Sequence, residues 1–192
     1  MNNDSNWIIV RIDGKIAGIS TDYRHLASIT ARLAKDCKAR YSEITAKKAD
    51  FDEIWQLKET TRWEDMMLFG TDFQKKVWKK LYELTRPEND DSQTPRLTSY
   101  SDFAELCQNR AGVRAVAHAI GLNPISVLIP CHLVVPKEAI DKMRLINKKA
   151  EATIFKGVDL CLNSILDDNS IDFGEYALGK KLKRELIKKE FA

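Results

Sequence analysis

The stretch Asn123-Pro-Ile-Ser-Val-Leu-Ile-Pro-Cys-His-Leu-Val-Val135 places Cys131 and His132 directly after an apolar run and a proline. The apolar residues 127–129 predict a short buried strand, and Pro130 ends it because proline lacks the backbone donor that a strand ladder needs. The cysteine therefore lies at an edge or turn. A metal ligand would need further ligands at short spacing, and none is present. On these residues alone, a reactive thiol and a packed core cysteine are equally good interpretations.

Length and composition describe an ordinary globular chain. Its 192 residues allow one or two domains, each with a core of its own. No run of about 18 apolar residues predicts a membrane span, and the first five residues lack the features of a signal peptide. The four cysteines include no CxxC pair, which argues against a zinc site or a disulfide scaffold. We therefore expect a cytoplasmic protein that does not bind membranes.

The net charge of +3 is too small to indicate nucleic-acid binding by itself. Nearly as many acidic as basic residues are interleaved along the chain, so any affinity for nucleic acid must come from local placement of the basic side chains.

The first half of the chain predicts a small α/β domain over residues 1–66 without visible chemistry. Residues 7–12 and 15–20 are rich in β-formers, and Asp13-Gly14 between them suits a tight hairpin turn. Apolar residues at helical spacing predict a helix over 21–38.

Residues 39–66 are harder to assign, because polar residues interrupt the apolar pattern. Tyr41–Thr45 could form a strand and Phe51–Leu57 a helical turn, with boundaries uncertain by several residues.

The second half begins with an amphipathic helix predicted over 72–84. Thr71-Asp-Phe-Gln74 has the capping-box pattern that starts a helix. The apolar face that follows consists of Phe73, Val77, Leu81 and Leu84. Residues 85–97 contain two prolines and a run of Asn and Asp, which predicts an exposed loop.

Two further helices predict a helix-turn-helix. Ser99, with Asp102 three positions on, starts the first, which continues to Gln108. Asn109 is expected to cap the next, and Gly121 to end it as the residue just past its last turn. One face of this last helix, with Val113, Val116 and Ile120, is expected to face the core. The opposite face carries Ala111, Arg114, Ala115 and His118. The pattern alone fits an ordinary surface helix better, because isolated helix-turn-helix matches are weak signals.

Four further stretches and one glutamate carry recognisable motifs. They are Gly70-Thr-Asp-Phe-Gln-Lys-Lys-Val-Trp78, Ser99-Tyr-Ser-Asp-Phe-Ala104, Arg114-Ala-Val116 and Gly174-Glu-Tyr-Ala-Leu-Gly-Lys-Lys-Leu-Lys183, followed by Glu190. Together with Asn-Pro-Ile-x-x-x-Ile-Pro-Cys-His-x-Val, they resemble the O6-alkylguanine-DNA alkyltransferases, or methylated-DNA–protein-cysteine methyltransferases, over about residues 68–136 and 173–190. The resemblance implies an α/β (α+β) fold. The small N-terminal domain would precede a helical, winged-helix-like DNA-binding domain, residues 67–192, that carries the helix-turn-helix and the active-site cysteine.

The resemblance also implies a reaction, namely repair of alkylated DNA by direct reversal. An alkyl group on O6 of guanine, or on O4 of thymine, would pass irreversibly to Cys131, and the protein would be consumed in one turnover. His132 would raise the thiolate fraction through a bridging water, because successive side chains in an extended segment point apart. Glu190 would orient His132, Asn123 would support the cysteine turn, and Tyr100 would protonate the leaving base.

The implied partner is double-stranded DNA with an alkylated guanine, bound through the minor groove by a monomer without cofactor or metal. The target atom is unreachable inside a duplex, so the base must be flipped out, and Arg114 matches the family's intercalating arginine. The other residues expected to face DNA are Ala111, Ala115, His118 and Tyr100. The residues expected at the substrate pocket are Gly174, Tyr176, Ala177 and Lys183.

The chain departs from the family pattern at three places. Leu133 replaces an arginine and Leu178 a glycine, and residues 137–172 stand where the family has a short loop. Apolar residues at helical spacing predict two short amphipathic helices in this insertion, with turns at Gly157 and at Asp167–Ser170. Because its ends return to the pocket, we expect the insertion to cover the pocket's outer rim and to disfavour bulky alkyl groups.

Two alternatives use the same residues differently. A lesion sensor would bind alkylated bases without repairing them, but proteins of that kind lack the acceptor cysteine. A helix-turn-helix transcription factor would need base-reading polar side chains on its recognition helix, where His118 is nearly the only candidate.

Overall fold

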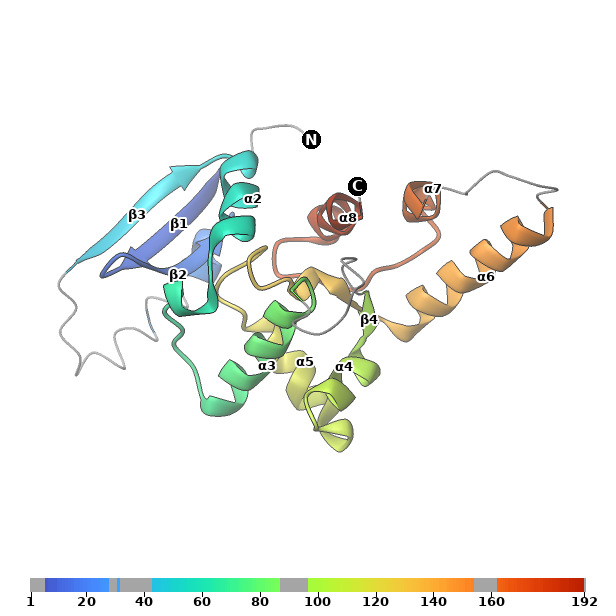
Figure 1. Ribbon diagram of the computed structural model, residues 1–192, viewed down its shortest axis with the longest axis horizontal. Coiled ribbons are helices and arrows are strands. Elements are labelled where there is room, and N and C mark those ends of the chain that lie inside the picture. Colours follow the sequence, from blue (N-terminus) through green and yellow to red (C-terminus); the bar gives the residue numbers. More distant parts are fainter. Residues whose placement is uncertain (1–5, 28–30, 32–42, 87–96, 154–161, 192) are drawn as a thin grey trace.

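The computed structural model describes residues 6–27, 31, 43–86, 97–153 and 162–191. Figure 1 shows a sheet with α2 (Phe51–Thr60) beside it. It also shows a group of helices formed by α3 (Asp72–Glu83), α4 (Tyr100–Leu106) and α5 (Val113–Gly121), and a further group formed by α6 (Lys137–Thr153), α7 (Leu162–Asp167) and α8 (Lys180–Glu190). Helices and strands are thus mixed, which confirms the predicted fold class; the winged-helix detail stays a prediction.

The predicted hairpin is confirmed. Strands β1 (Trp7–Ile12) and β2 (Lys15–Ser20) pair antiparallel around a turn in which both Asp13 (φ 48°) and Gly14 (φ 79°) are left-handed. A two-residue turn of this hand matches the natural twist of a hairpin. The third strand, β3 (Ile44–Ala49), pairs with the other edge of β1, so the sheet order is β2-β1-β3.

The elements after the hairpin are partly displaced from their predicted places. Residues 23–27 are helical, and the rest of the predicted helix 21–38 lies largely outside the described residues. The predicted strand at 41–45 was wrong in position, because β3 begins at Ile44. Helix α2 (Phe51–Thr60) is longer than the predicted turn, and its Asp50 cap accepts the amide of Glu53 at 2.8 Å. The polar side chains of β3 are mostly exposed, which is why no alternating pattern marked it.

Helix α3 (Asp72–Glu83) starts with the predicted capping box. The Thr71 hydroxyl accepts the Gln74 amide at 3.2 Å, and the Gln74 side chain accepts the Thr71 amide at 3.0 Å. Val77 and Leu81 are fully buried, but Phe73 was wrongly assigned to the core face and is 36% exposed. Two positions four residues apart differ by about 40° around the helix axis. Phe73 is two such steps from Leu81, so it lies at the edge of the buried face.

Helices α4 (Tyr100–Leu106) and α5 (Val113–Gly121) form the predicted helical pair, with different ends. Ser99 caps α4 through the Asp102 amide at 3.1 Å, but α4 ends at Leu106, short of Gln108. Asn109 does not cap α5, because a 3-10 turn, η2 (Arg110–Gly112), intervenes and Gly112 precedes the helix. Gly121 is the last residue of α5 and does not have positive φ, so it is not a left-handed residue past the helix end.

The segment 123–131, called the cysteine turn below, is not a strand as predicted. Residues 127–129 are fully buried but lie in a turn, with Val127 at a φ of 72°. Their apolar character reflects burial, and a short apolar run cannot by itself distinguish a strand from a buried turn. The turn ends in a 3-10 helix, η3 (Cys131–Leu133), which leads into β5 (Val134–Val135).

The cysteine turn packs against the edge of the N-terminal sheet. The Ile19 amide of β2 donates to the Pro124 carbonyl at 3.0 Å, and the Ser126 amide donates to the Ile19 carbonyl at 3.1 Å. Trp7 and Ile16 of the sheet share one apolar core with Trp78 of α3 and with the turn itself. The sheet therefore supports the cysteine turn directly, and the division into domains at residue 66 stays a prediction.

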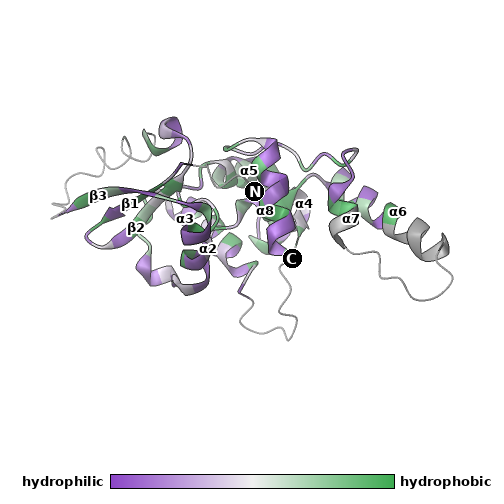
Figure 2. Ribbon diagram, turned by 90° about the horizontal axis from the view of Figure 1, so that it is seen from above, coloured by the Kyte–Doolittle hydropathy of each residue, from purple (hydrophilic) through white to green (hydrophobic). Residues whose placement is uncertain are grey.

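The insertion contains two helices, as expected: α6 (Lys137–Thr153) and α7 (Leu162–Asp167), while the predicted turn at Gly157 lies outside the described residues. They share a separate apolar cluster with Ile187 of the last helix, α8 (Lys180–Glu190). In Figure 2 the ribbon of α8 is mostly hydrophilic, and its buried residues Leu186 and Ile187 face the rest of the molecule.

Candidate active site

A cavity of about 340 Å³ opens beside the cysteine turn. Its walls come from α4, α5, the cysteine turn and the segment before α8. The lining residues are Tyr100, Ala117, Ile120, Gly121, Asn123, Ser126, Cys131, Glu175, Tyr176 and Ala177. A concave, largely apolar site with a few convergent polar groups is the usual form of a small-molecule or base pocket.

Cys131 begins η3 at the wall of this cavity and is only 8% exposed. The parallel pairing of β4 (Thr98–Ser99) with β5 brings Tyr100, which follows β4, close to it. Asn123 holds the cysteine turn closed. Its Nδ2 donates to the Ile129 carbonyl at 2.8 Å and lies 3.0 Å from the Cys131 Sγ, while its Oδ1 accepts the Ile125 amide at 3.1 Å. The predicted supporting role of Asn123 therefore has a geometric basis.

The Cys131 thiol is held in its protonated form at rest. Burial raises the pKa of this thiol, and the hydrogen bond from Asn123 and the nearby Lys183 ammonium offset that effect only in part. Because the thiolate is the nucleophile, reaction at this sulfur needs a base that removes the proton as the new bond forms.

His132 faces away from the cavity, toward α8. Its Nε2 lies 2.8 Å from Glu190 Oε1, and its side chain is fully buried. Burial lowers the pKa of His132, and the hydrogen bond to Glu190 opposes this. Among the described residues, Nδ1 of His132 has no hydrogen-bond partner. A neutral imidazole with a free nitrogen is the form that a general base requires.

Glu190 pairs with a second group, the ammonium of Lys58, through Oε2. Burial works to raise the pKa of Glu190, but the hydrogen bond to His132 and the Lys58 charge outweigh it, so the net shift is downward. Burial lowers the pKa of Lys58, although Glu190 opposes that. These three buried side chains, His132, Glu190 and Lys58, form a continuous chain, called the relay below.

Lys58 was not among the predicted site residues. It comes from α2, in the segment expected to lack visible chemistry, and it pairs with Glu190. The one available signal is a lysine on the otherwise buried face of α2, four positions after Ile54. A lysine at such a position needs a buried partner, but no pattern could identify Glu190 as that partner.

Two tyrosines, Tyr100 and Tyr176, line the cavity together with Cys131. Burial raises the pKa of Tyr100 and of Tyr176, and the charge of a Cys131 thiolate would raise both further. Both hydroxyls therefore stay protonated and able to donate. The Tyr176 hydroxyl is buried and faces Ser126 and Cys131.

Two expected pocket residues, Gly174 and Lys183, lie behind the cavity wall. The Lys183 ammonium donates to the Val134 carbonyl at 2.8 Å and to the Glu175 carbonyl at 3.3 Å. Burial lowers the pKa of Lys183 to about 8, despite the nearby Cys131. Gly174 has a φ of 80°, and a Cβ at this position would lie 2.9 Å from the Pro136 ring. Both residues thus fix the segment that carries Tyr176 and Ala177.

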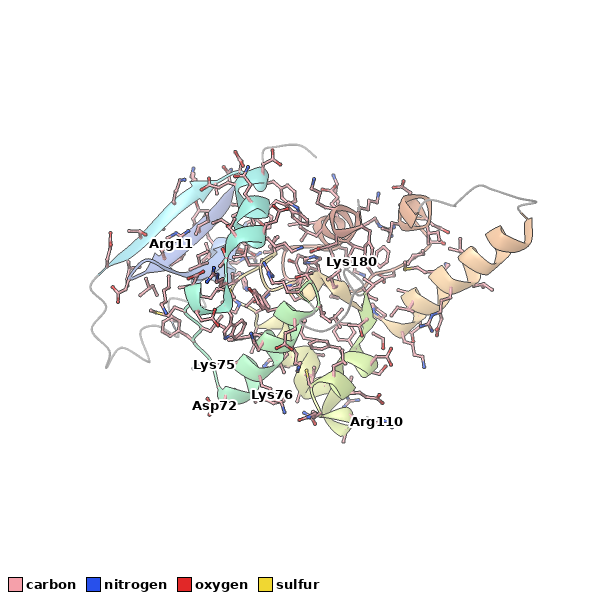
Figure 3. The ribbon with its side chains drawn as sticks, viewed as in Figure 1. Arg11, Asp72, Lys75, Lys76, Arg110 and Lys180 are labelled. Atoms are coloured by element: carbon pink, nitrogen blue, oxygen red, sulfur yellow. The ribbon has the colours of Figure 1, made fainter. Side chains whose placement is uncertain are left out.

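All the residues expected to face DNA except Tyr100 are exposed, whereas Tyr100 is half-buried and lines the cavity. Ala111, Arg114, Ala115 and His118 are all exposed, while Val116, Ala119 and Ile120 on the other side of α5 are buried. Figure 3 places Arg110, near the start of α5, at the same end of the molecule as Lys75 and Lys76 of α3. The predicted division of faces is therefore present.

The insertion does not cover the cavity as expected. Among the described residues, none of 137–172 lines it. The Arg184 guanidinium of α8 instead donates to the Leu166, Asp168 and Ile171 carbonyls, which fixes the end of the insertion against the far side of α8. Leu133, which replaces an arginine of the family pattern, is fully buried in the main core.

The part of the chain that the structure describes contains no group of three or more His, Cys, Asp or Glu side chains suited to a metal ion. No helix in that part has the length and apolar character needed to cross a membrane.

Comparison with known proteins bears directly on this site. Residues 72–152 match the family model of the "6-O-methylguanine DNA methyltransferase, DNA binding domain". A protein of Acanthamoeba polyphaga mimivirus named "Probable methylated-DNA--protein-cysteine methyltransferase" is 45% identical over 73 residues, which are 38% of this chain and 44% of that protein. The "Methylated-DNA--protein-cysteine methyltransferase" of Haemophilus influenzae is 39% identical over 69 residues, 36% of this chain and 34% of its own length. The matched segments thus span less than half of either relative.

One solved structure shares the fold. The O6-methylguanine-DNA methyltransferase of Pyrococcus kodakaraensis superposes with a TM-score of 0.56 at 19% identity, covering 97% of this chain and 92% of that one. The resemblance stated from the motifs is confirmed by these matches. Residues 72–152, less than half of this chain, thus resemble the 6-O-methylguanine DNA methyltransferase DNA-binding domain.

Proposed function

We propose that this protein repairs alkylated DNA by transferring an alkyl group from O6 of guanine to its own Cys131. The observation that carries the proposal is the position of Cys131 at the wall of a cavity, held by Asn123, with His132 paired to Glu190 next to it. The family model matched over residues 72–152, which include Cys131, and the names of the matched relatives support it. O4-alkylthymine is a second substrate with the same reactive group.

The proposed reaction is a displacement at the alkyl carbon. The Cys131 sulfur forms a bond to that carbon while the bond from the carbon to O6 breaks, and the electron pair of that bond stays with the guanine. The thiol proton passes to His132 through a bridging water, with Glu190 stabilising the imidazolium that forms. Tyr100 donates a proton to the departing base and regains one from solvent, to which His132 releases the thiol proton, so that the net change moves one hydrogen from the thiol to the guanine. The product is a stable thioether, so each molecule reacts once.

The substrate base must leave the duplex to reach the cavity. We propose that the α5 face enters the minor groove and that Arg114 fills the place of the flipped nucleotide. The small side chains Ala111 and Ala115 support this arrangement, because they let the helix backbone approach DNA closely. Lys75, Lys76 and Arg110 lie on the same end of the molecule, where they can contact phosphates. A monomer in the cytoplasm, without a cofactor, completes the proposal.

The decisive experiment is intact-protein mass spectrometry after incubation with a duplex that carries one O6-methylguanine. Repair predicts that the protein gains the mass of one methyl group in place of the thiol hydrogen, in proportion to the lesion supplied. Unmethylated duplex is the control. Tight binding to the lesion without a mass change would instead identify a lesion sensor.

A further inference from the structure

Lys58 is a buried cation that touches neither the cavity nor the expected DNA surface. It is only 7% exposed, and its ammonium lies 4.4 Å from the centre of the Trp55 ring. Its ion-pair partner among the described residues is Glu190, which is 132 residues away in the sequence. Burying a charge is costly, so a lysine in this position needs a specific reason to be there.

The two oxygens of Glu190 are divided between two partners. Oε1 meets His132 Nε2 at 2.8 Å, and Oε2 meets the Lys58 ammonium. The side chains of Lys58 and Glu190 are 9% and 3% exposed. A carboxylate with one partner can rotate about its last torsion, whereas one with two partners on different elements cannot. Lys58 therefore fixes the plane of the carboxylate and the direction from which it meets the imidazole.

This arrangement also selects the tautomer of His132. An ionised carboxylate only accepts hydrogen bonds, so Nε2 must carry the hydrogen and Nδ1 must be the free acceptor. Nδ1 has no hydrogen-bond partner among the described residues and is available to take the cysteine proton. Were Glu190 protonated, it could donate to Nε2, and the hydrogen would move to Nδ1, where it would block that role.

We propose that Lys58 is a positioning residue for alkyl transfer, which acts through Glu190 to hold His132 in the orientation and tautomer that accept the Cys131 proton. This inference rests on the proposed function. It assigns to the N-terminal α/β segment a part in the chemistry, beyond supporting the cysteine turn.

Charged groups around the relay come from several elements. Those that face His132, Glu190 or Lys58 are Lys183 on α8, Arg86 after α3 and Glu59 on α2. The Lys58 charge acts with burial to lower the pKa of His132. Removing Lys58 should therefore raise that pKa, so that His132 becomes protonated and inactive at a higher pH than in the unaltered protein.

The test is the single-turnover rate of methyl transfer for Lys58→Met, measured over a range of pH. We expect a rate about 10–100-fold lower, the usual effect of removing an outer partner of a functional histidine. We also expect the acidic limb of the pH profile to move to higher pH. Affinity for lesion duplex, measured in a Cys131→Ser background, should be unchanged. Lys47→Met is the matched control, because it removes an exposed ion pair with Glu53 of the same α2.

Two further variants separate positioning from folding. Lys58→Arg should restore much of the transfer rate and move the acidic limb of its pH profile back toward that of the unaltered protein. Lys58→Gln should do neither. If Lys58→Met does not fold, the contrast between Arg and Gln still decides the question. In a Glu190→Gln background, Lys58→Met should lower the rate less than about twofold further, because the two residues act as one unit.

Different results overturn different claims. If Lys58→Met reacts at the original rate with the original pH profile, Lys58 has no positioning role. A lower rate with an unchanged pH limb would indicate a merely structural role and would also overturn the inference. If the unaltered protein gains no methyl group from lesion duplex, the proposed function itself fails.

Discussion

Cys131 and His132 are neighbours in the sequence but face two chemically different sides of the molecule. The Cys131 side is a cavity with Asn123, Tyr100 and Tyr176 around the sulfur. The His132 side is the relay, in which the buried His132 ring meets the Glu190–Lys58 ion pair. The 3-10 turn η3 between them lets one short segment serve both sides.

The difference between the two sides lies in where their residues come from. The cavity is built from residues 100–177, whereas the relay joins α2, η3 and α8. In the proposed reaction, the cavity would select and hold the substrate, and the relay would prepare the proton acceptor. Variants on the cavity side should therefore change which substrates react, while variants on the relay side should change rate and pH dependence for every substrate alike.

The largest effect is expected from Cys131→Ala, which should abolish alkyl uptake. Peptide mapping after reaction should find a single modified site at Cys131 in the unaltered protein. Cys107→Ala is the control and should react normally, because burial raises the pKa of Cys107 to about 11 and leaves it unreactive. Modification at Cys37, Cys107 or Cys161 would contradict the assignment.

On the relay side, Glu190→Gln should lower the transfer rate about 100-fold, because general-base catalysis contributes 10²–10⁴-fold. The loss should be the same for methyl and for benzyl groups. The midpoint of thermal unfolding should fall as well, since Lys58 is left buried without a counter-charge. Glu185→Gln on the same helix is the control. A transfer rate that falls for only one of the two alkyl groups would show that the relay also affects substrate selection.

On the exposed face of α5, Arg114→Ala should impair repair of duplex DNA by about 10–100-fold but barely affect reaction with free O6-methylguanine. The reason is that flipping a base costs a few kcal/mol, which an inserted side chain offsets. Tyr100→Phe should slow both reactions. Both rates can be followed by methyl uptake. Equal losses on the two substrates for Arg114→Ala would show that Arg114 does not fill the place of the flipped nucleotide.

The pH dependence should show the lowered pKa of His132. A histidine with an ordinary pKa near 6.5 would lose its base form just below neutrality. Burial lowers the pKa of His132, so the base form persists and the transfer rate should fall only below about pH 6.5. Single-turnover rates between about pH 5 and 8 measure this limb. A fall in rate already at pH 7 would mean that another group accepts the proton.

The smallest functional effect is expected from Arg184→Met. This change removes three hydrogen bonds to carbonyls of the insertion and should lower the free energy of unfolding by about 1–3 kcal/mol. The ratio of methyl to benzyl transfer rates should not change, because the described part of the insertion does not line the cavity. Denaturant unfolding and paired rate measurements test both statements. A changed ratio would show that the insertion does restrict which alkyl groups react.

Local signals in the sequence predicted the parts of the fold that depend on neighbours in the chain. Asp13-Gly14 predicted the hairpin, and Thr71 with Gln74 predicted the start of α3, because turns and caps are made by residues a few positions apart. Residues 127–129 were correctly expected to be buried but wrongly assigned to a strand, because an apolar run does not show that it packs as a turn against Ile19 and Trp78.

The candidate site divides in the same way. The motif identified Cys131, His132 and Asn123, and the resemblance supplied Glu190 and the two tyrosines. Lys58 could not be predicted, because its role exists only once α2 and α8 are packed together. The insertion was correctly expected to be helical, but where its helices pack depends on Arg184 and Ile187 of a distant segment.

The long sequence separations within the site have a consequence for folding. Glu190 is 58 residues from His132 and 132 from Lys58, and both contacts close only when distant segments have met. Contacts between distant segments form slowly, because ordering the intervening chain costs entropy before any contact forms. Partly folded molecules should therefore contain Cys131 without a working proton acceptor. Under the proposed reaction, alkyl uptake from DNA should therefore begin only after the last of these long-range contacts has formed.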